Sequence, residues 1–289
     1  MTEPAPLEVR KTYKLYVGGA FPRTESGRTF PVHGPDGRLL AHACQASRKD
    51  VRDAVKAAAG AQASWAARTP YNRAQILYRV AEMLDGRRDQ FAAELGAAGV
   101  ADPRAEVLAA VDRWVWYAGW ADKLAMILGS VNPVAGPYLD VSWPEPTGVV
   151  GVICPDDAPL LALVSRVAPA IVLGNTTVVV ASEKAPLPAI SFGEVLATSD
   201  LPGGVVNVLT GFRDELIGPM SSHEALGAID LSGASADQRR IAEEGAAESL
   251  TRVIVPRPGE TDWRSDRAQS PYIIADSCET KTFWHPVGV

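Results

Sequence analysis

From Gly148 onward the sequence alternates short apolar segments with longer helical ones, and this alternation leaves few folds open to the chain. The apolar segments are GVVGVIC, TTVVV, GVVNVLTG, GAIDLSG and TRVIV, with helical spacing between them. Such a pattern predicts an α/β fold, with a parallel sheet covered by helices on both faces. Right-handed crossovers make the sheet doubly wound. Ligands of such sheets bind at the carboxyl ends of the strands, here near residues 154–157, 180–183, 210–211 and 232–233.

The residues before Gly148 predict short strands followed by helices. Gly, Pro and Ser punctuate residues 14–47, as expected for strands and turns. Ser47 with Asp50 resembles a capping box, and Thr69-Pro70 marks the start of a second helix that we expect to run through residues 71–95. A third helix is expected at about residues 104–128.

An exposed hairpin is expected next, in SVNPVAGPYLDVSWPEPTG. Its four prolines exclude a helix, whereas Val134, Tyr138, Val141 and Trp143 favour strands.

Composition and charge exclude several classes of function. The net charge of −6 and the absence of a Lys/Arg block argue against a nucleic-acid partner. MTEPAPLEVRKTYK lacks the apolar core of a signal peptide, and no apolar run approaches the roughly 20 residues that cross a bilayer. We therefore expect a cytoplasmic protein without a membrane partner. Cys44, Cys154 and Cys278 are widely separated and odd in number, which predicts reduced thiols.

The first strand–helix turn offers few candidate reactive or ligand-binding residues. It reads ICPDDAP and lacks the G-x-G-x-x-G phosphate signature. Asp156 and Asp157 could form a metal or acid/base pair, but adjacent carboxylates at a strand end are more often solvated or capping, so no metal is expected. Cys154 could be a nucleophile near a helix N-terminus, although a small buried strand residue is the more common case. Residues 221–223, Ser-Ser-His, are better explained as a surface cluster at a helix end than as part of a triad.

Seven segments, taken in order, resemble the aldehyde dehydrogenase superfamily. They are YVGGAF, RAQILYRVAEML, WYAGWADK, EPTGVVGVICP, APAIVLGNTTVVVASEKAPLPA, LPGGVVNVLTG and ETKTFW. The resemblance runs in register from about Leu15 to Val255 and resumes over the tail. It implies a Rossmann-like NAD-binding lobe, a catalytic lobe, and oligomerisation strands formed by a hairpin plus the C-terminal strand. The implied cofactor is NAD or NADP.

Position by position, the resemblance implies a degenerate site. Asp157 stands where the family has a catalytic-site Asn, Val180 where it has a ribose-binding Lys, and Ala234 where a Ser contacts the pyrophosphate. Val255 lies in VIVPRPG, which replaces the stretch that carries the general base. The positions at which the resemblance implies remaining cofactor contacts are Ile153, Pro155, Ser182, Glu183, Gly211 and Gly233.

These replacements weaken the implied chemistry. Loss of a charge-assisted hydrogen bond from Lys to the ribose lowers dinucleotide affinity by about 1.5–3 kcal/mol, roughly ten- to a hundredfold. An Asp in place of a neutral amide repels the negative charge that develops on an oxyanion. After Pro256 only a polar linker and the tail follow, so the catalytic Cys of the family has no counterpart and no thiohemiacetal can form on it.

The resemblance also divides the chain into segments. Residues 1–131 are expected to form the N-terminal strands and helices of the NAD-binding lobe, 132–147 the oligomerisation hairpin, 148–256 the Rossmann-like core, 257–270 a polar linker in place of the catalytic lobe, and 271–289 the C-terminal oligomerisation strand. The residues expected to mediate oligomerisation are Val134, Tyr138, Val141, Trp143, Glu279, Thr280, Lys281, Phe283 and Trp284.

The leading hypothesis is a pseudo-subunit that is not an enzyme on its own. It would assemble with a full-length aldehyde dehydrogenase or with another copy of itself, because a lobe is missing while the strand beyond it remains, and an isolated strand needs a sheet to join. The alternatives are an NAD(P)-dependent aldehyde oxidoreductase active alone or in a complex, a weak dinucleotide sensor, and a vestigial product.

Overall fold

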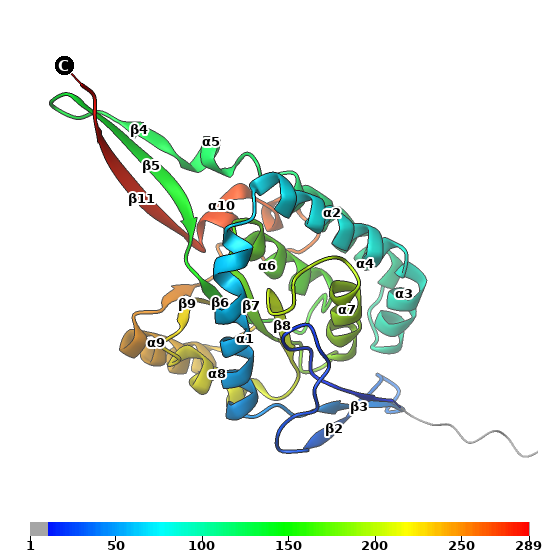
Figure 1. Cartoon of the computed structure of the whole chain (residues 1–289). Helices are drawn as coiled ribbons and strands as arrows, with labels where there is room; N and C mark the ends of the chain where they lie inside the picture. Colours follow the sequence, from blue (N-terminus) through cyan, green and yellow to red (C-terminus); the bar gives the residue numbers. More distant parts are fainter. Residues whose placement is uncertain (1–10, 289) are drawn as a thin grey trace, which may run out of the picture.

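The centre of the molecule is a five-stranded sheet with the order β10-β9-β6-β7-β8 (Figure 1). We describe residues 11–288 of a computed structural model. All neighbouring strands pair in parallel. The predicted α/β class and doubly wound sheet are therefore confirmed. The strands are β6 (Val149–Ile153), β7 (Thr176–Val180), β8 (Val206–Leu209), β9 (Leu226–Asp230) and β10 (Arg252–Ile254).

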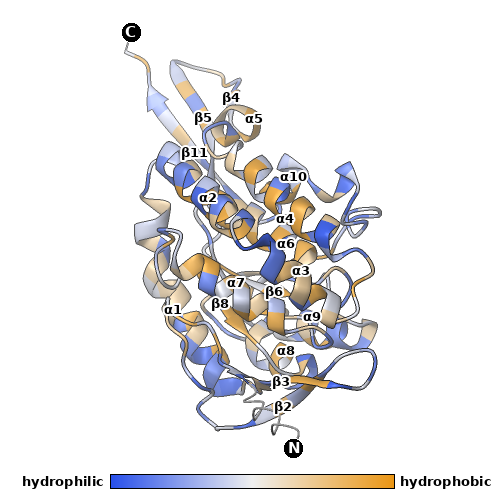
Figure 2. Ribbon diagram, turned by 90° about the vertical axis from the view of Figure 1, so that its right-hand side faces the viewer, coloured by the Kyte–Doolittle hydropathy of each residue, from blue (hydrophilic) through white to orange (hydrophobic). Residues whose placement is uncertain are grey.

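Helices cover both faces of this sheet because its side chains alternate between two hydrophobic cores. Val150 and Val152 pack into the core on one face, and Val149 and Ile153 into the core on the other. Helices α6 and α7 lie on the first face with α2, α3 and α4 packed outside them, and α1, α8 and α9 lie on the second. Figure 2 shows hydrophobic residues concentrated along α4 and α6. The bounds are α1 (Arg48–Ala66), α2 (Pro70–Asp85), α3 (Arg88–Ala97), α4 (Pro103–Ala118), α6 (Leu161–Val172), α7 (Leu187–Ala197), α8 (Arg213–Ser221) and α9 (Ala236–Ser249).

The predicted N-terminal strands and helix starts are present. Strands β1 (Thr12–Tyr13), β2 (Thr29–His33) and β3 (Leu39–Cys44) form a small sheet in the order β1-β3-β2. At the start of α1 the Asp50 carboxylate accepts a hydrogen bond from the Ser47 N–H at 2.7 Å, as the capping box predicts. At the start of α2 the Thr69 hydroxyl accepts one from the Asn72 N–H.

Two predicted helices are shorter than expected. The prediction of a single helix over residues 71–95 is wrong, because α2 ends at Asp85 and α3 begins at Arg88, with Gly86 at the break. The helix expected over 104–128 ends at Ala118, with Gly119 as its C-cap, and α5 (Leu124–Leu128) follows after turns. Glycine disfavours a helix interior by about 1 kcal/mol relative to alanine. Each break keeps the same apolar face buried, so periodicity alone did not reveal it.

A three-stranded antiparallel sheet projects from the body (Figure 1) and is called the arm here. It consists of β4 (Ser130–Asn132), β5 (Tyr138–Pro146) and β11 (Cys278–Pro286), in the order β11-β5-β4. All nine residues of β11 pair with β5. The hairpin is therefore present, but Val134 lies in its turn and not on a strand as expected. Pro133 and Pro137 bracket that turn and lack the N–H group that would extend the strand pairing.

Residues 255–277, called the strap here, connect β10 to the arm. They contain a short 3-10 helix, η1 (Asp266–Ala268), and α10 (Pro271–Ala275). Within residues 11–288, no helix is long and apolar enough to cross a membrane. The signal-peptide expectation rests largely on residues 1–10, which lie outside the described residues.

The Asn175 side chain ties the root of the arm to the sheet. Its Nδ2 donates to the carbonyl oxygens of Ala170 and Ser277, both at 2.9 Å, and its Oδ1 accepts from the Gly148 N–H at 2.9 Å. Asn175 is fully buried. One amide therefore joins the end of α6, the entrance to β6 and the residue before β11.

We predict that Asn175→Ala lowers the free energy of unfolding, because it leaves buried backbone groups unpaired at a cost of about 1–3 kcal/mol each. Urea denaturation measures the effect. The control is Asn72→Ala, which removes only an exposed side-chain contact with Arg68 and should change stability by less than about 0.5 kcal/mol. Equal unfolding midpoints for wild type and Asn175→Ala would contradict this role.

Candidate functional site

The carboxyl edge of the central sheet gathers most of the residues for which cofactor contact was predicted. The turns after β6 and β7 carry Asp156 and Ser182-Glu183, and α8 begins after β8 with Arg213. These segments lie side by side because parallel strands end at a common edge. Side chains from three turns therefore meet at one place, as the strand pattern predicts.

Arg213 and Asp156 form the centre of this cluster. The guanidinium donates to both carboxylate oxygens, from Nη1 at 3.0 Å and from Nη2 at 2.7 Å. Nη2 also donates to the carbonyl oxygen of Cys154 at 2.7 Å, so Arg213 lies against the end of β6. Its side chain is only 7% exposed. Burial alone would raise the pKa of Asp156, but the hydrogen bonds and charge of Arg213, with the Ser182 hydroxyl and the Lys184 N–H, lower it to about 2.

Ser182 and Glu183, implied by the resemblance as cofactor ligands, are bonded within the chain. The Ser182 hydroxyl donates to Asp156 at 2.8 Å and accepts from the Ala185 N–H at 3.0 Å. The Glu183 carboxylate accepts the Arg213 N–H at the first position of α8. The serine thus shapes the turn before α7, and the glutamate binds the N-terminus of α8.

The N-terminus of α6 is also bound by a carboxylate. Glu106 extends from α4 and accepts the N–H groups of Leu160 and Leu161, at 2.9 and 3.3 Å. Its burial raises its pKa, while these two backbone bonds act in the opposite direction. Sequence reasoning missed Glu106. The available signal was an acidic residue one position before Val107, on the buried stripe of its helix.

The loop after β9 lies against the end of β6. The Gly233 N–H donates to the Ile153 carbonyl at 2.8 Å. A Cβ atom on Gly233 would lie 2.1 Å from the Cys154 oxygen, so any side chain here would require the backbone to move. At Gly211 a Cβ would meet the Ala46 nitrogen at 3.1 Å, and its φ of +149° is a conformation that favours glycine. Both glycines are used for close packing within the chain.

The remaining predicted cofactor residues also pack internally. Val180 is fully buried in the core beside α1 and α8, and Ala234 is partly buried against the same core. Ile153 is fully buried, and Pro155 is buried in the turn that follows. Val255, at the degenerate general-base position, is 40% exposed directly after β10.

Asp157, at the catalytic-Asn position of the resemblance, is bonded to the strap. Its carboxylate accepts the indole N–H of Trp263 at 2.9 Å, and that tryptophan is 4% exposed. The guanidinium carbon of Arg166 lies 5.2 Å from the centre of the same ring, within cation–π range. Asp156 and Asp157 therefore have separate partners and do not act as a pair.

The segment expected to be a polar linker, residues 257–270, also contributes side chains to the core. Trp263 and Ala268 are buried, and Arg113 of α4 binds the linker backbone. Arg113 donates to the carbonyl oxygens of Trp263 at 2.8 Å and Ala268 at 2.6 Å. The polar composition of residues 257–270 did not indicate this packing. Buried arginines on α4 and α6 bind the strap through its backbone carbonyl groups.

The other local candidates do not form a reactive site. Cys154 is fully buried, and burial followed by the negative charge of Asp230 raises its thiol pKa to about 12. Ser222 is the C-cap of α8, whereas Ser221 is fully buried, which corrects the expectation of a surface cluster. The His223 Nδ1 accepts the Ala225 N–H. No group of three or more His, Cys, Asp or Glu residues arranged for a metal ion occurs within residues 11–288.

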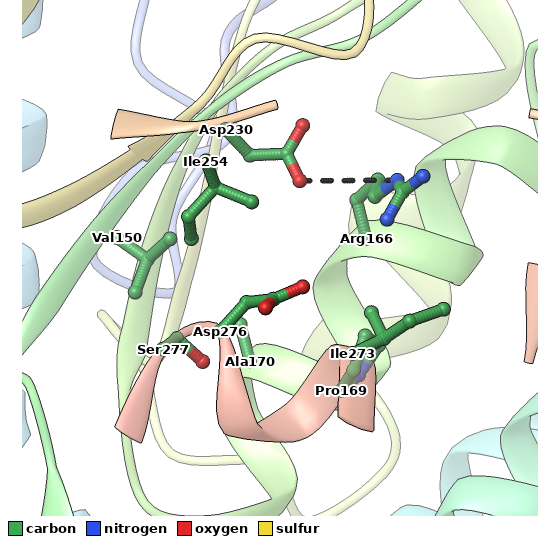
Figure 3. Close-up of a pocket in the computed structure, with 9 residues that line it drawn as sticks. All are labelled: Val150, Arg166, Pro169, Ala170, Asp230, Ile254, Ile273, Asp276 and Ser277. Carbon is green, nitrogen blue, oxygen red and sulfur yellow. Dashed lines mark ion pairs between the residues drawn. The ribbon is translucent and has the colours of Figure 1, made fainter. Parts of the chain in front are cut away.

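A cavity beneath the strap is too small for a cofactor. Its volume is about 10 Å³, enough for a single water molecule. In Figure 3 Arg166 points toward Asp230, and the Arg166 Nε lies 3.8 Å from the Asp230 Oδ2. The lining residues are Val150, Arg166, Pro169, Ala170, Asp230, Ile254, Ile273, Asp276 and Ser277.

One face of the arm is mainly polar apart from Tyr138 and Trp284, and the other is mainly apolar, with exceptions such as Glu145 and Lys281. On the polar face Asn132 donates to Asp140 and Ser142, and Ser142 shares a hydrogen bond with Thr282. On the other face Val131, Val141 and Phe283 are aligned by the strand register. Val131 is 71% and Phe283 48% exposed, although they are apolar.

The other predicted oligomerisation residues, except Val134, also lie on the arm. Leu139 and Trp143 extend the apolar face, and both are exposed. Trp284 packs against Tyr138, with 5.9 Å between their ring centres. Lys281 forms an ion pair with Glu145, and Glu279 pairs with Arg252 of β10. Thr280 is exposed. Their role in assembly stays a prediction.

The dinucleotide implied by the resemblance does not fit this edge as it stands. Val180, at the position where the resemblance implies a ribose-binding Lys, is buried, and the N–H group of Gly233 already has an acceptor. The Arg213 guanidinium covers the end of β6. No chemical step through a dinucleotide follows from these residues.

Comparison with known proteins identifies the relatives of this fold. Residues 21–263 match the model of the aldehyde dehydrogenase family. The chain is similar to retinal dehydrogenase 2 of Gallus gallus, with 31% identity over 88% of this chain and 50% of the relative.

Solved structures agree with this match. An aldehyde dehydrogenase from Bacillus cereus in complex with NAD+ is 28% identical, with a TM-score of 0.79 over 85% of this chain and 51% of its own. The 3,6-anhydro-L-galactose dehydrogenase in complex with NAP is 25% identical, with a TM-score of 0.80 over 86% of this chain and 53% of its own. The chain thus spans about half the length of the relatives it matches.

We predict that Cys154 does not react with thiol reagents in the folded protein. Its raised pKa keeps it protonated at about pH 8, and its burial excludes the reagent. Iodoacetamide labelling followed by peptide mass spectrometry should modify the half-buried Cys278 first, and Cys44 and Cys154 only after unfolding. Rapid labelling of Cys154 in the native state would refute its assignment as a packing residue.

The Asp156–Arg213 pair predicts a contribution to acid stability. Because folding lowers the Asp156 pKa to about 2, this contribution is present above the ordinary pKa of Asp and is lost as the pH falls from about 4 to about 2. Asp156→Asn should therefore flatten the fall in unfolding free energy across that window, measured by urea denaturation. Identical slopes in the two proteins would contradict the pairing.

Proposed function

The chain belongs to the aldehyde dehydrogenase family, and we propose that it serves there as a subunit without catalytic chemistry of its own. It assembles through the arm, either with a full-length aldehyde dehydrogenase or with a second copy of itself. Members of this family oxidise aldehydes with NAD(P). In this chain the role left to the fold is assembly.

The observation that carries the proposal is the retained arm beyond a short strap. Residues 255–277 connect β10 to β11, fewer than the roughly 50 residues of a small domain. They pack against α4 and α6 through Arg113 and Trp263. A catalytic lobe therefore has no room between these two strands, yet β11 still pairs along its whole length with β5.

The apolar face of the arm supports a protein partner. Val131, Trp143 and Phe283 are all more than 45% exposed and lie on the same face. Contiguous exposed apolar groups of this kind mark interaction surfaces. β11 and β4 are the outer strands of the sheet as described, so their outward backbone groups can add a strand from another subunit.

A groove at the base of the arm adds to this surface. Its volume is about 600 Å³. Residues of α1, α2 and α5 line one side, and residues 143–146 of β5 line the other, so Trp143 belongs to both the groove and the apolar face. A segment of a partner subunit could therefore contact the arm and the body together.

The position of Asp157 argues against catalysis by this chain. Trp263 donates its indole N–H to that carboxylate, and no cysteine of this chain lies exposed beside it. Cys154 is buried and Cys278 lies at the root of the arm. Neither thiol is placed to attack an aldehyde at that position.

We predict that Phe283→Glu weakens assembly by about tenfold or more, because a charge would be desolvated at the interface. The matched control is Leu108→Glu on α4, since Leu108 is 47% exposed and Phe283 48%. Size exclusion with light scattering should be carried out on the chain alone and after co-expression with a full-length aldehyde dehydrogenase.

The expected result is a complex, with the full-length protein or with a second copy, that Phe283→Glu disrupts and Leu108→Glu leaves intact. A wild-type chain that remains monomeric in both settings would contradict the proposal. Equal loss of assembly in the two variants would show that the arm is not the contact.

A further inference from the structure

Three of the helix N-termini at the carboxyl edge, those of α6, α8 and α9, are bound by the chain's own side chains. Free N–H groups at a helix start attract anions, and parallel sheets bind phosphates there. Here the carboxylate of Glu106 accepts two N–H groups of the α6 start, and that of Glu183 accepts the first N–H of α8. At α9 the Ser235 hydroxyl accepts the Gln238 N–H, and the Gln238 side-chain oxygen accepts the Ser235 N–H.

The space between these helix starts is filled by Arg213. Its guanidinium bonds to Asp156 and to the Cys154 carbonyl, and so spans the end of β6. Asp156 also accepts the N–H groups of Glu183 and Lys184, at 2.9 and 3.3 Å. The positive charge that could attract a phosphate is therefore already neutralised inside the protein.

Backbone packing closes the edge on the side of β9. Gly233 donates its N–H to Ile153, and its α-carbon lies so close to Cys154 that no added atom fits between them. The N–H group of Gly233 is therefore already used within the chain and is not free to bind a phosphate. In the same region Trp263 donates its indole N–H to Asp157, which nevertheless stays exposed.

From these contacts we infer that the carboxyl edge is a self-liganded closed surface, and that the chain takes no dinucleotide. The Asp156–Arg213 pair is the element that blocks the edge. The inference concerns a different part of the molecule from the arm and does not rest on the proposed assembly. The family's nucleotide site here serves to hold the sheet and its helices together.

Calorimetric titration with NAD and with NADP tests this inference. The wild-type chain should show no saturable heat at millimolar dinucleotide. The double variant Asp156→Asn/Arg213→Ala removes both members of the pair, so that neither charge is left unpaired, and should gain at least about tenfold in affinity. The control is Arg240→Ala/Glu244→Gln, which removes an exposed ion pair on α9 and should bind no better than wild type.

Saturable binding to the wild-type chain below millimolar concentration would overturn the inference of a closed edge. Failure of the double variant to bind would overturn the assignment of the pair as the block, provided that circular dichroism shows a folded protein. Should the double variant not fold, Arg213→Lys replaces it, because lysine keeps the charge but cannot span Asp156 and the Cys154 carbonyl at once. It should bind dinucleotide more tightly than wild type, and equal binding would count against the pair in the same way.

Discussion

Buried helix starts need acceptors, and the carboxyl edge of this sheet depends on how they are supplied. In many parallel α/β proteins a bound phosphate accepts these N–H groups. Here Glu106 and Glu183 do so, and Arg213 compensates the neighbouring charge of Asp156. The edge is therefore complete without a ligand. An unpaired buried donor costs about 1–3 kcal/mol, so internal acceptors of this kind stabilise the helix starts.

Buried arginines also need hydrogen-bond partners, and this need explains how the strap is held against the body. Arg113 and Arg166 are buried on α4 and α6, and both bind the strap, through its carbonyl groups and the Trp263 ring. The strap then leads to Ser277, whose carbonyl is held by Asn175. The position of the arm thus follows from buried polar contacts on the body. Under the proposed function, these contacts would present the arm to a partner subunit in a fixed orientation.

Much of the fold could be predicted because apolar periodicity is a local property. The strands from Val149 to Ile254 and their parallel order follow from alternating runs, and the hairpin follows from prolines between apolar residues. The helix breaks at Gly86 and Gly119 were not predicted, because the buried face continues across them. The contact of Trp263 with Asp157 was not predicted, because the two residues are distant in sequence. The roles of Asp156 and Glu106 depend on contacts between separate elements, which composition and spacing do not encode.

We propose that this chain enters an assembly as a subunit that carries no dinucleotide. Native mass spectrometry of the chain mixed with a full-length aldehyde dehydrogenase and NAD tests it most directly. We expect mixed assemblies in which bound NAD molecules equal the full-length subunits in number, or homo-oligomers of this chain without NAD. A monomeric chain that binds one NAD molecule would contradict it.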